Sequence, residues 1–233
     1  MSSAKTGDLE DFHALLDLVP VDAAAKAQLS VAMSGHGRLY HNVAHLAELW
    51  RGHRRHGAAE NMFAPAVEPL IACTIAFHDS VYDPSRRDNE RRSAAMWMRA
   101  SKGAPMEPRD RAWVARTIRA THDHLGYKAR LDIEGVGDDP KGAAEILRER
   151  ARLWVLDLDL SPLGAAEPIF EHNTDLLRRE DRCAADADWR ARMLSFFERL
   201  ARAPQIYRVP TLAEVYEAPA RRNISRLLQR LSA

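Results

Sequence analysis

The side chains best suited to chemistry in this sequence are a histidine and an aspartate, His78 and Asp79, at the end of an apolar run. Upstream apolar residues recur at spacings of three and four, which is the pattern of a buried helix face, and His78 takes the next position on that face. Asp79 projects roughly 100° further round the helix, so one small object can touch both side chains. A buried carboxylate without a partner is costly. A divalent metal ion would be a suitable partner.

A second stretch rich in histidine lies earlier, where a glycine-containing loop leads into a helix. His41 and His45 are one helical turn apart on a shared face, a spacing that suits metal ligation or a ligand with a supporting residue. For any single histidine, a role in packing or capping is the alternative. The stretch therefore adds candidate nitrogen ligands to the His-Asp pair.

Two acids, Asp157 and Asp159, interrupt a later apolar segment. On a continuous helix they project about 200° apart, so only one of them can face a given site. Imidazole and carboxylate ligands together are typical of Mn²⁺, Fe²⁺, Co²⁺, Ni²⁺ or Zn²⁺, rather than of Ca²⁺ or an all-oxygen Mg²⁺ site.

The elements that must position these residues are all predicted to be helices. Pro20, Ser34-Gly35, Gly103 and Pro105 mark ends, and Asp22, Pro65 and Pro108 mark beginnings. Apolar spacing predicts helices at 9–19, 22–33, about 41–56, 65–78, 88 to before 103, 108–121, 143–160, 167–182, 188–200, 212–216 and 219–231. We expect a loop over 126–140 and find no convincing strand, repeat or linker.

The predicted fold class is therefore all-α, with residues 1–233 forming a single domain. We expect the metal-site core to span about 36–165 and the C-terminal helices, 166–233, to pack on it.

Composition and charge argue against several classes of partner. Hydrophobic residues make up 46% and charged residues 29% of the chain, and the formal net charge is +1, which gives no general reason to bind a nucleic-acid polymer or an acidic membrane surface. No secretory signal or membrane-spanning run is recognisable. Cys73 and Cys183 are far apart and are interpreted as free thiols of a reducing compartment. We expect a cytoplasmic protein, and its oligomeric state is left open.

Taken in order, His41, then His78-Asp79, then an aspartate in the segment 156–160 form a recognisable series. Further short matches are Tyr40-His41-Asn42 with His45, the run 78–83, Asn89-Glu90 with Ser93-Ala94, Asp159-Leu160-Ser161 with Leu163-Gly164, Ile206-Tyr207, and Ala220-Arg221 with Asn223. In these features the chain resembles the HD superfamily and, within it, the group described as predicted metal-dependent HD-domain phosphohydrolases. Pro162 departs from the pattern, since an aliphatic residue is usual there.

The resemblance implies a helical bundle of the HD-domain type that hydrolyses a phosphate ester, with nucleotides among the candidate substrates. It implies that His41, His78, Asp79 and Asp159 bind the metal, with Asp157 as a competitor for the last position. Such a metal would lower the pKa of a bound water. Asp79 would orient or deprotonate that water, and Glu90 or His45 would act as a supporting base or proton carrier.

The residues near the His-Asp pair also suggest how a substrate is held. Arg86, Arg87 and Arg91 are candidates for binding phosphate oxygens, and Tyr82 for stacking on a base, with surface ion pairing and packing as the alternatives.

Two other functions stay open. His122 and His124 lie where some members of the superfamily hold a second metal, and a few such two-iron enzymes are oxygenases. A helical module that binds a nucleotide or a metal without turnover is the other alternative.

Overall fold

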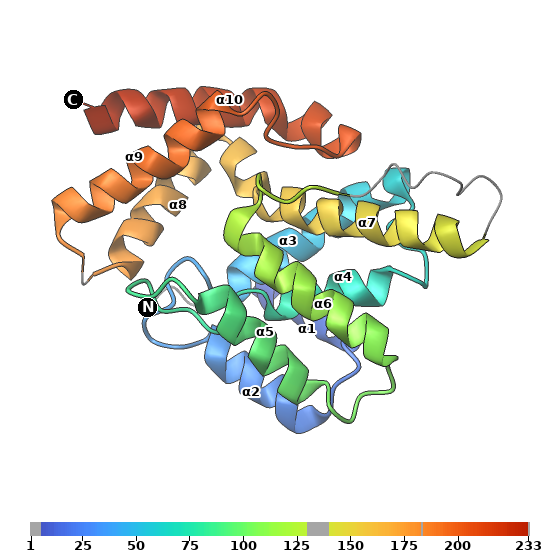
Figure 1. Cartoon of the computed structure of the whole chain (residues 1–233). Helices are drawn as coiled ribbons and strands as arrows, with labels where there is room; N and C mark the ends of the chain where they lie inside the picture. Colours follow the sequence, from blue (N-terminus) through green and yellow to red (C-terminus); the bar gives the residue numbers. More distant parts are fainter. Residues whose placement is uncertain (1–5, 130–139, 183, 233) are drawn as a thin grey trace.

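Every regular element of the residues described, 6–129, 140–182 and 184–232 of a computed structural model, is a helix (Figure 1). The predicted all-α class is confirmed. The α-helices are α1 Thr6–Asp17, α2 Ala23–Met33, α3 Val43–His56, α4 Glu68–Phe77, α5 Asn89–Ala100, α6 Pro108–Ala120, α7 Pro140–Asp159, α8 Glu167–Glu180, α9 Asp186–Arg202 and α10 Pro210–Ser232. Three short 3₁₀ helices are η1 Gly57–Glu60, η2 Thr121–Asp123 and η3 Ser161–Gly164.

The polar caps explain where several helices begin. The carboxylate of Asp22 accepts the backbone N–H of Ala25 at 2.7 Å and caps α2, as the sequence predicts. Asn42 caps α3 in the same manner by accepting the N–H groups of Ala44 and His45, at 2.8 and 3.3 Å. The second cap fixes the direction in which the His41–His45 stretch enters its helix.

Two predicted boundaries were wrong. Pro65 lies in the turn before α4 rather than in its first turn, and Pro69 takes the early helical position instead. The two short helices expected on either side of Pro219 are one helix, α10. Buried residues on both sides of the proline, Leu212 and Ile224 among them, keep both halves packed, and this packing outweighs the hydrogen bond that the proline cannot make.

The apolar run that ends at His78 forms α4, and every residue from Leu70 to Phe77 is buried. A helix that is apolar on all sides belongs inside a protein. It contacts α1, α3, α5, α6 and α7, which surround it. The end of α4 therefore delivers His78 and Asp79 to the interior, close to the N-terminus of α3 and the C-terminus of α7.

The helices α8 and α10 pack against η3, the segment that follows α7, and α9 packs against α10 (Figure 1). Asn223 of α10 donates to the carbonyls of Leu163 and Ala165, at 2.8 and 2.9 Å, and the hydroxyl of Tyr207 donates to the carbonyl of Leu160 at 2.7 Å. These bonds bind the C-terminal helices to the turn directly after the aspartates of α7.

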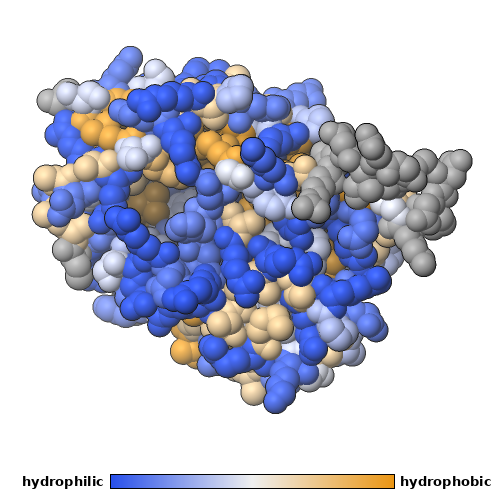
Figure 2. All heavy atoms as spheres, in the orientation of Figure 1, coloured by the Kyte–Doolittle hydropathy of each residue, from blue (hydrophilic) through white to orange (hydrophobic). Residues whose placement is uncertain are grey.

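Charged and polar residues cover much of the face shown in Figure 2, with smaller apolar areas between them. Among the described residues, none of the helices combines the length and apolar character that a membrane crossing requires. Cys73 is a buried, unpaired thiol, whereas Cys183 and most of the loop expected over 126–140 lie outside the described residues.

Candidate metal centre

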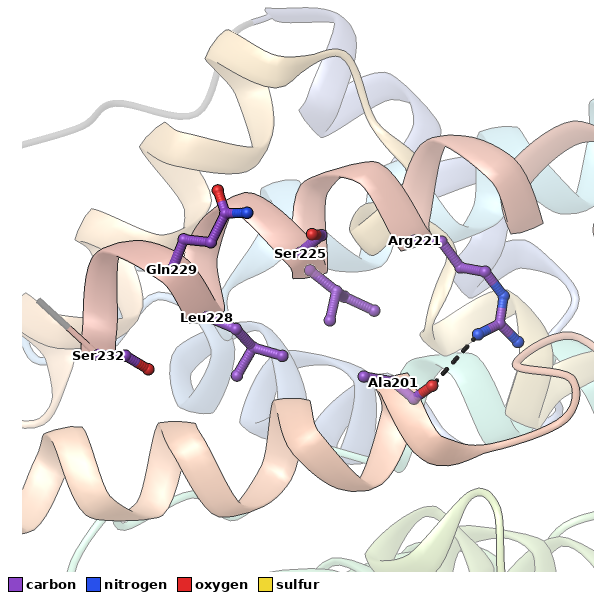
Figure 3. Close-up of a pocket in the computed structure, with 7 residues that line it drawn as sticks. Ala201, Arg221, Ser225, Leu228, Gln229 and Ser232 are labelled. Carbon is purple, nitrogen blue, oxygen red and sulfur yellow. Dashed lines mark hydrogen bonds between the residues drawn. The ribbon is translucent and has the colours of Figure 1, made fainter.

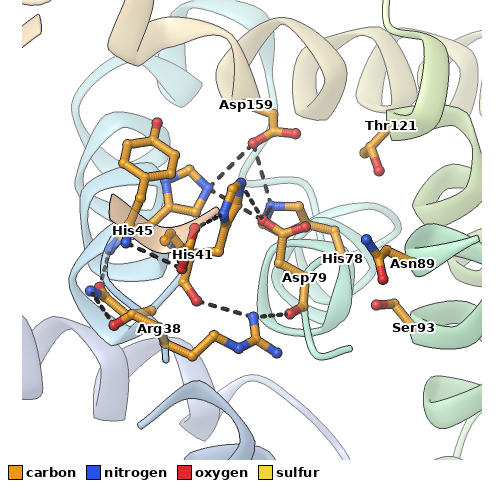
Figure 4. Close-up of polar contacts among 12 residues, drawn as sticks. Arg38, His41, His45, His78, Asp79, Asn89, Ser93, Thr121 and Asp159 are labelled. Carbon is orange, nitrogen blue, oxygen red and sulfur yellow. Dashed lines mark hydrogen bonds and ion pairs between the residues drawn. The ribbon is translucent and has the colours of Figure 1, made fainter. Parts of the chain in front are cut away.

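The histidines and aspartates of the sequence pattern converge on one point from remote parts of the chain (Figure 4). His41 precedes and His45 lies within the first turn of α3, His78 and Asp79 directly follow α4, and Asp159 is the last residue of α7. The three helix ends meet because α3 and α7 both pack on α4.

The distances within the cluster centre on Nε2 of His78. This atom lies 3.1 Å from Oδ2 of Asp79 and 3.3 Å from Oδ1 of Asp159. Nε2 of His45 lies 3.4 Å from the same Asp159 oxygen and 3.8 Å from Asp79 Oδ2. Nε2 of His41 is 4.0 Å from Asp79 Oδ2. His45 therefore lies nearer to the carboxylate of Asp79 than His41 does, and His41 lies at the edge of the cluster.

Hydrogen bonding shows which nitrogen of His78 is free for a ligand. Nδ1 lies 2.9 Å from the carbonyl of Ile75, and because a carbonyl can only accept, Nδ1 carries the proton. In the neutral ring, the lone pair is then on Nε2. That atom is buried and has no hydrogen-bond partner in the described part of the chain, although two carboxylate oxygens lie near it.

Two carboxylates beside Nε2 of His78 require positive charge, which either a proton on that nitrogen or a metal ion can supply. One ligand atom each from His45, His78 and Asp79 all lie within 4.8 Å of one another, and this cluster could hold a metal ion. The donor set fits such an ion, since it combines imidazole nitrogens with carboxylate oxygens.

The electrostatics of the cluster agree with a demand for positive charge. Burial raises the pKa of Asp79, but the imidazoles of His78 and His41 outweigh that effect and hold it well below its usual range. The pKa of Asp159 is also lowered, chiefly by His78 against the opposing effect of burial. Both carboxylates are therefore ionised at neutral pH, and a divalent ion would replace imidazole protons as their counter-charge.

Glu180, at the end of α8, orients His41. Its Oε1 accepts the backbone N–H groups of Leu39, Tyr40 and His41 at 2.9, 3.3 and 3.2 Å, and its Oε2 lies 2.6 Å from Nδ1 of His41. The carboxylate keeps the proton of His41 on Nδ1 and turns Nε2 toward Asp79. Glu180 was not predicted from the sequence, because it is one acid among several in its helix and carries no local signal.

Arg38 holds the two ligand-bearing segments together. Its guanidinium donates to the carbonyls of His41, Asp79 and Ser80, at 3.0, 2.7 and 3.1 Å. It also lies over the ring of Tyr82, 5.7 Å from its centroid. Figure 4 shows Arg38 extended beneath the cluster toward Asp79. Like the role of Glu180, this role of Arg38 was not predicted from the sequence.

The two aspartates of α7 have different surroundings, because the helix continues through both of them. The fully buried Asp157 accepts the backbone N–H groups of Arg208 and Val209 and pairs with the guanidinium of Arg208 at 2.9 Å. Asp159 points into the cluster instead, where its Oδ2 lies 2.8 Å from Nε2 of His124. Asp157 thus binds the segment before α10, and Asp159 is the aspartate that lies beside the histidines.

The other residues expected at the site lie at its edge or outside it. Glu90 pairs with Nδ1 of His122 at 3.3 Å. The exposed Arg86 and Arg91 both pair with Asp88, at 2.7 Å each. Arg87 is also exposed. The expected contact of these arginines with a phosphate stays a prediction, and their side chains are not held toward the cluster.

Tyr82 packs against a candidate ligand. Its ring stacks on His41, with 3.9 Å between the ring centroids. One face of Tyr82 is therefore covered, so the packing alternative describes this ring better than stacking on a base does.

Several residues of the sequence pattern hold the loop between α4 and α5. The side chain of Asn89 bonds both the N–H and the carbonyl of Asp83, at 3.0 and 2.8 Å. Ser93 does the same for Val81, at 3.0 and 3.1 Å. These contacts fix the chain directly after Asp79. Asn89 and Ser93 therefore have a structural role that accounts for their presence in the sequence pattern.

No protein-family model, curated protein or solved structure matches the chain. The resemblance to the HD superfamily therefore depends on the residue pattern, beside the geometry of the cluster.

Proposed function

We propose that the chain is a metal-dependent phosphohydrolase of the HD type. The observation that carries the proposal is the convergence of His41, His45, His78, Asp79 and Asp159 on one point, where Nε2 of His78 lies 3.1 and 3.3 Å from two carboxylate oxygens. Imidazole ligands favour Mn²⁺, Fe²⁺, Co²⁺, Ni²⁺ or Zn²⁺ at this point over Mg²⁺ alone.

The cluster is buried but can be reached from solvent. The side chain of His78 is 2% exposed, whereas those of Asp79 and His41 are each 16% exposed. A phosphate group can therefore approach from the side of His41 and Asp79, while His78 anchors the centre from within.

The chemistry follows from these positions. A bound divalent ion would polarise a phosphoryl oxygen and make a water molecule more acidic. Asp79 reaches both the cluster and its open side, so it is placed to take up or orient the proton of that water. His45 contacts both aspartates, and the pair of Glu90 and His122 lies further out, where it can exchange protons with solvent.

The experiment is a screen for phosphate release. Protein loaded with Mn²⁺, Co²⁺ or Ni²⁺ is incubated with nucleoside mono-, di- and triphosphates and with p-nitrophenyl phosphate, beside an Asp79→Ala variant. We expect metal-dependent release by the wild type and only background release by the variant. Equal background rates for both proteins, with every metal and substrate, would favour a binding module without turnover.

A two-iron oxygenase is the second candidate, and one observation favours it. His124 lies 2.8 Å from Asp159, and His122 pairs with Glu90, so further ligands are available beside the first cluster. Metal analysis of the purified protein separates the two functions. Two irons per chain, together with oxygen consumption, would overturn the hydrolase proposal.

A further inference from the structure

A large cavity lies along one face of α9, between this helix and the segment that follows it. Its volume is about 1030 Å³, which is the size of a pocket for an organic ligand. Its lining includes Leu125, Leu194, Ser195, Arg199, Arg202 and Arg208. We call it the α9 cavity.

The α9 cavity lies beside the segment that carries His124, since Arg199 in its lining pairs with Asp123 at 3.0 Å. Leu125 directly follows His124, whose Nε2 lies 2.8 Å from Asp159. Arg208 pairs with Asp157, two residues before Asp159 on α7, and also donates to the carbonyl of Tyr127 at 3.0 Å. One wall of the cavity is thus continuous with the segment that carries His124, and the other is held by Asp157 on the far side of α7.

The lining combines apolar surface with arginine side chains. The α9 residues at positions 191, 194, 195, 198, 199 and 202 recur at helical spacing, so they form one stripe. Leu194 and Leu125 supply apolar surface, whereas Arg199 and Arg202 lie further along the stripe. This combination suits a ligand that has an organic part and an anionic part.

Arg199 and Arg202 form exposed ion pairs that a ligand can replace. Arg199 pairs with Asp123 at 3.0 Å, and the two side chains are 49% and 48% exposed. Arg202 pairs with Glu198 at 2.7 Å, and these side chains are 77% and 44% exposed. Ion pairs this exposed contribute little to stability, so a phosphate or carboxylate can displace the protein carboxylates at small cost. Arg208 differs, because it is held on the buried Asp157.

A second groove, between α9 and α10, does not share these features (Figure 3). It measures about 500 Å³, and its arginine, Arg221, is directed to the backbone carbonyls of Ala201 and Ala203 and to Glu217. No charged group there is available to a ligand.

We propose that the α9 cavity binds an organic phosphate that carries a second anionic group, with the organic part against Leu125 and Leu194 and the second anion on Arg199 and Arg202. The proposal builds on the proposed function, since it places the scissile phosphate at the metal centre. Nucleoside diphosphates belong to this class of compound, and nucleoside monophosphates lack the second anion.

The test measures binding without turnover, by fluorescence anisotropy on the full chain. The probes are α,β-methylene ADP and AMP, each with an N-methylanthraniloyl label. Removing a charged hydrogen-bond partner weakens binding about tenfold or more. We expect the double variant Arg199→Ala/Arg202→Ala to weaken binding of the ADP analogue by at least about tenfold and to leave the AMP analogue nearly unaffected.

Two further variants sharpen the result. Arg179→Ala removes an equally exposed arginine that pairs with Asp175 on α8, and its binding should equal that of the wild type. Ser195→Phe fills the cavity without touching a charge, and it should weaken binding of both probes.

The outcomes separate this inference from the proposed function. Equal affinity of all variants for the ADP analogue, or no binding by the wild type at millimolar concentration, overturns the α9 cavity as a binding site, even if phosphate is released. Binding that depends on Arg199 and Arg202 supports the cavity, even if no phosphate is released with any metal, and in that case only the hydrolase proposal fails.

Discussion

Oε2 of Glu180 lies 2.6 Å from Nδ1 of His41, although the two residues are 139 positions apart in the sequence. Oε1 of the same carboxylate accepts three consecutive backbone N–H groups, including that of His41. Glu180 therefore fixes both the backbone and the ring of a candidate metal ligand. Burial raises the pKa of Glu180, but the hydrogen bond with His41 outweighs it and leaves the pKa lowered, so the carboxylate is ionised near neutral pH.

The variant Glu180→Gln should weaken metal binding. The amide keeps the size of the side chain but loses the charge that orients His41, and such supporting residues typically contribute about 10–100-fold to metal affinity. Isothermal titration with Zn²⁺ or Mn²⁺ measures the change. Glu171→Gln, on the same helix and paired with Arg230 at the surface, is the matched control. Unchanged affinity in Glu180→Gln would mean that His41 needs no such support.

The two aspartates of α7 should give opposite results. Asp159→Ala should abolish metal binding while the protein stays folded, because Asp159 contributes an oxygen to the cluster. Asp157→Ala should lower the free energy of unfolding by about 3–5 kcal/mol, since it leaves Arg208 and two backbone N–H groups without their buried partner. Urea unfolding and metal titration of both variants check this. If Asp157→Ala is stable but no longer binds the metal, Asp157 is the metal ligand in place of Asp159.

Metal binding should raise thermal stability. A ligand that binds only the folded state, present at 100 times its Kd, adds about 2.7 kcal/mol to the free energy of unfolding. We expect Mn²⁺, Co²⁺, Ni²⁺ or Zn²⁺ to raise the Tm, EDTA to reverse the rise, and Asp79→Ala to show none. Differential scanning calorimetry measures the shift. A wild-type Tm that no divalent ion changes would count against a metal centre.

His53 should make stability depend on pH. Burial lowers its pKa to about 4, and its Nδ1 accepts the indole N–H of Trp154 at 3.1 Å, so the folded state requires a neutral ring. The unfolded chain binds the proton near pH 6.5. The contribution of neutral His53 to the free energy of unfolding is therefore fully present above pH 6.5. It is lost as the pH falls toward 4, and the total loss is about 3 kcal/mol.

Urea unfolding between pH 7 and pH 4 measures that loss. His53→Gln should be less stable at pH 7 but should lose less stability on acidification, and His13→Gln, at an exposed position of α1, serves as the control. If both variants follow the wild-type pH dependence, His53 does not govern it.

Much of the fold could be predicted from local patterns in the sequence. The three-and-four spacing before His78 correctly indicated a buried helix, and Pro108 and Asp22 correctly marked helix starts. Such signals work because capping bonds and apolar faces depend on residues only a few positions apart. The continuity of α10 through Pro219 could not be predicted, because packing on both sides of the proline decides it.

The candidate site was predictable only in part, for the same reason. The histidines and aspartates carry their chemistry in their side-chain type, but Glu180 and Arg38 act through contacts between distant segments, which leave no local trace. Conversely, Arg86 and Arg91 were expected to face a substrate, and the nearby Asp88 pairs with both of them. Whether an arginine pairs with a neighbouring carboxylate or with a substrate depends on the geometry of the loop, which the sequence alone does not specify.

The attachment of α7 to the segment 207–209 joins ligands made early in synthesis to supports made late. Chains emerge from the N-terminus, and His41, His78 and Asp159 leave the exit tunnel before Glu180, Tyr207 and Arg208 do. During that interval the nascent chain has its ligands but lacks the groups that hold them in place. We therefore expect the ion to be bound tightly only after the segment 207–209 has been synthesised and has packed on α7.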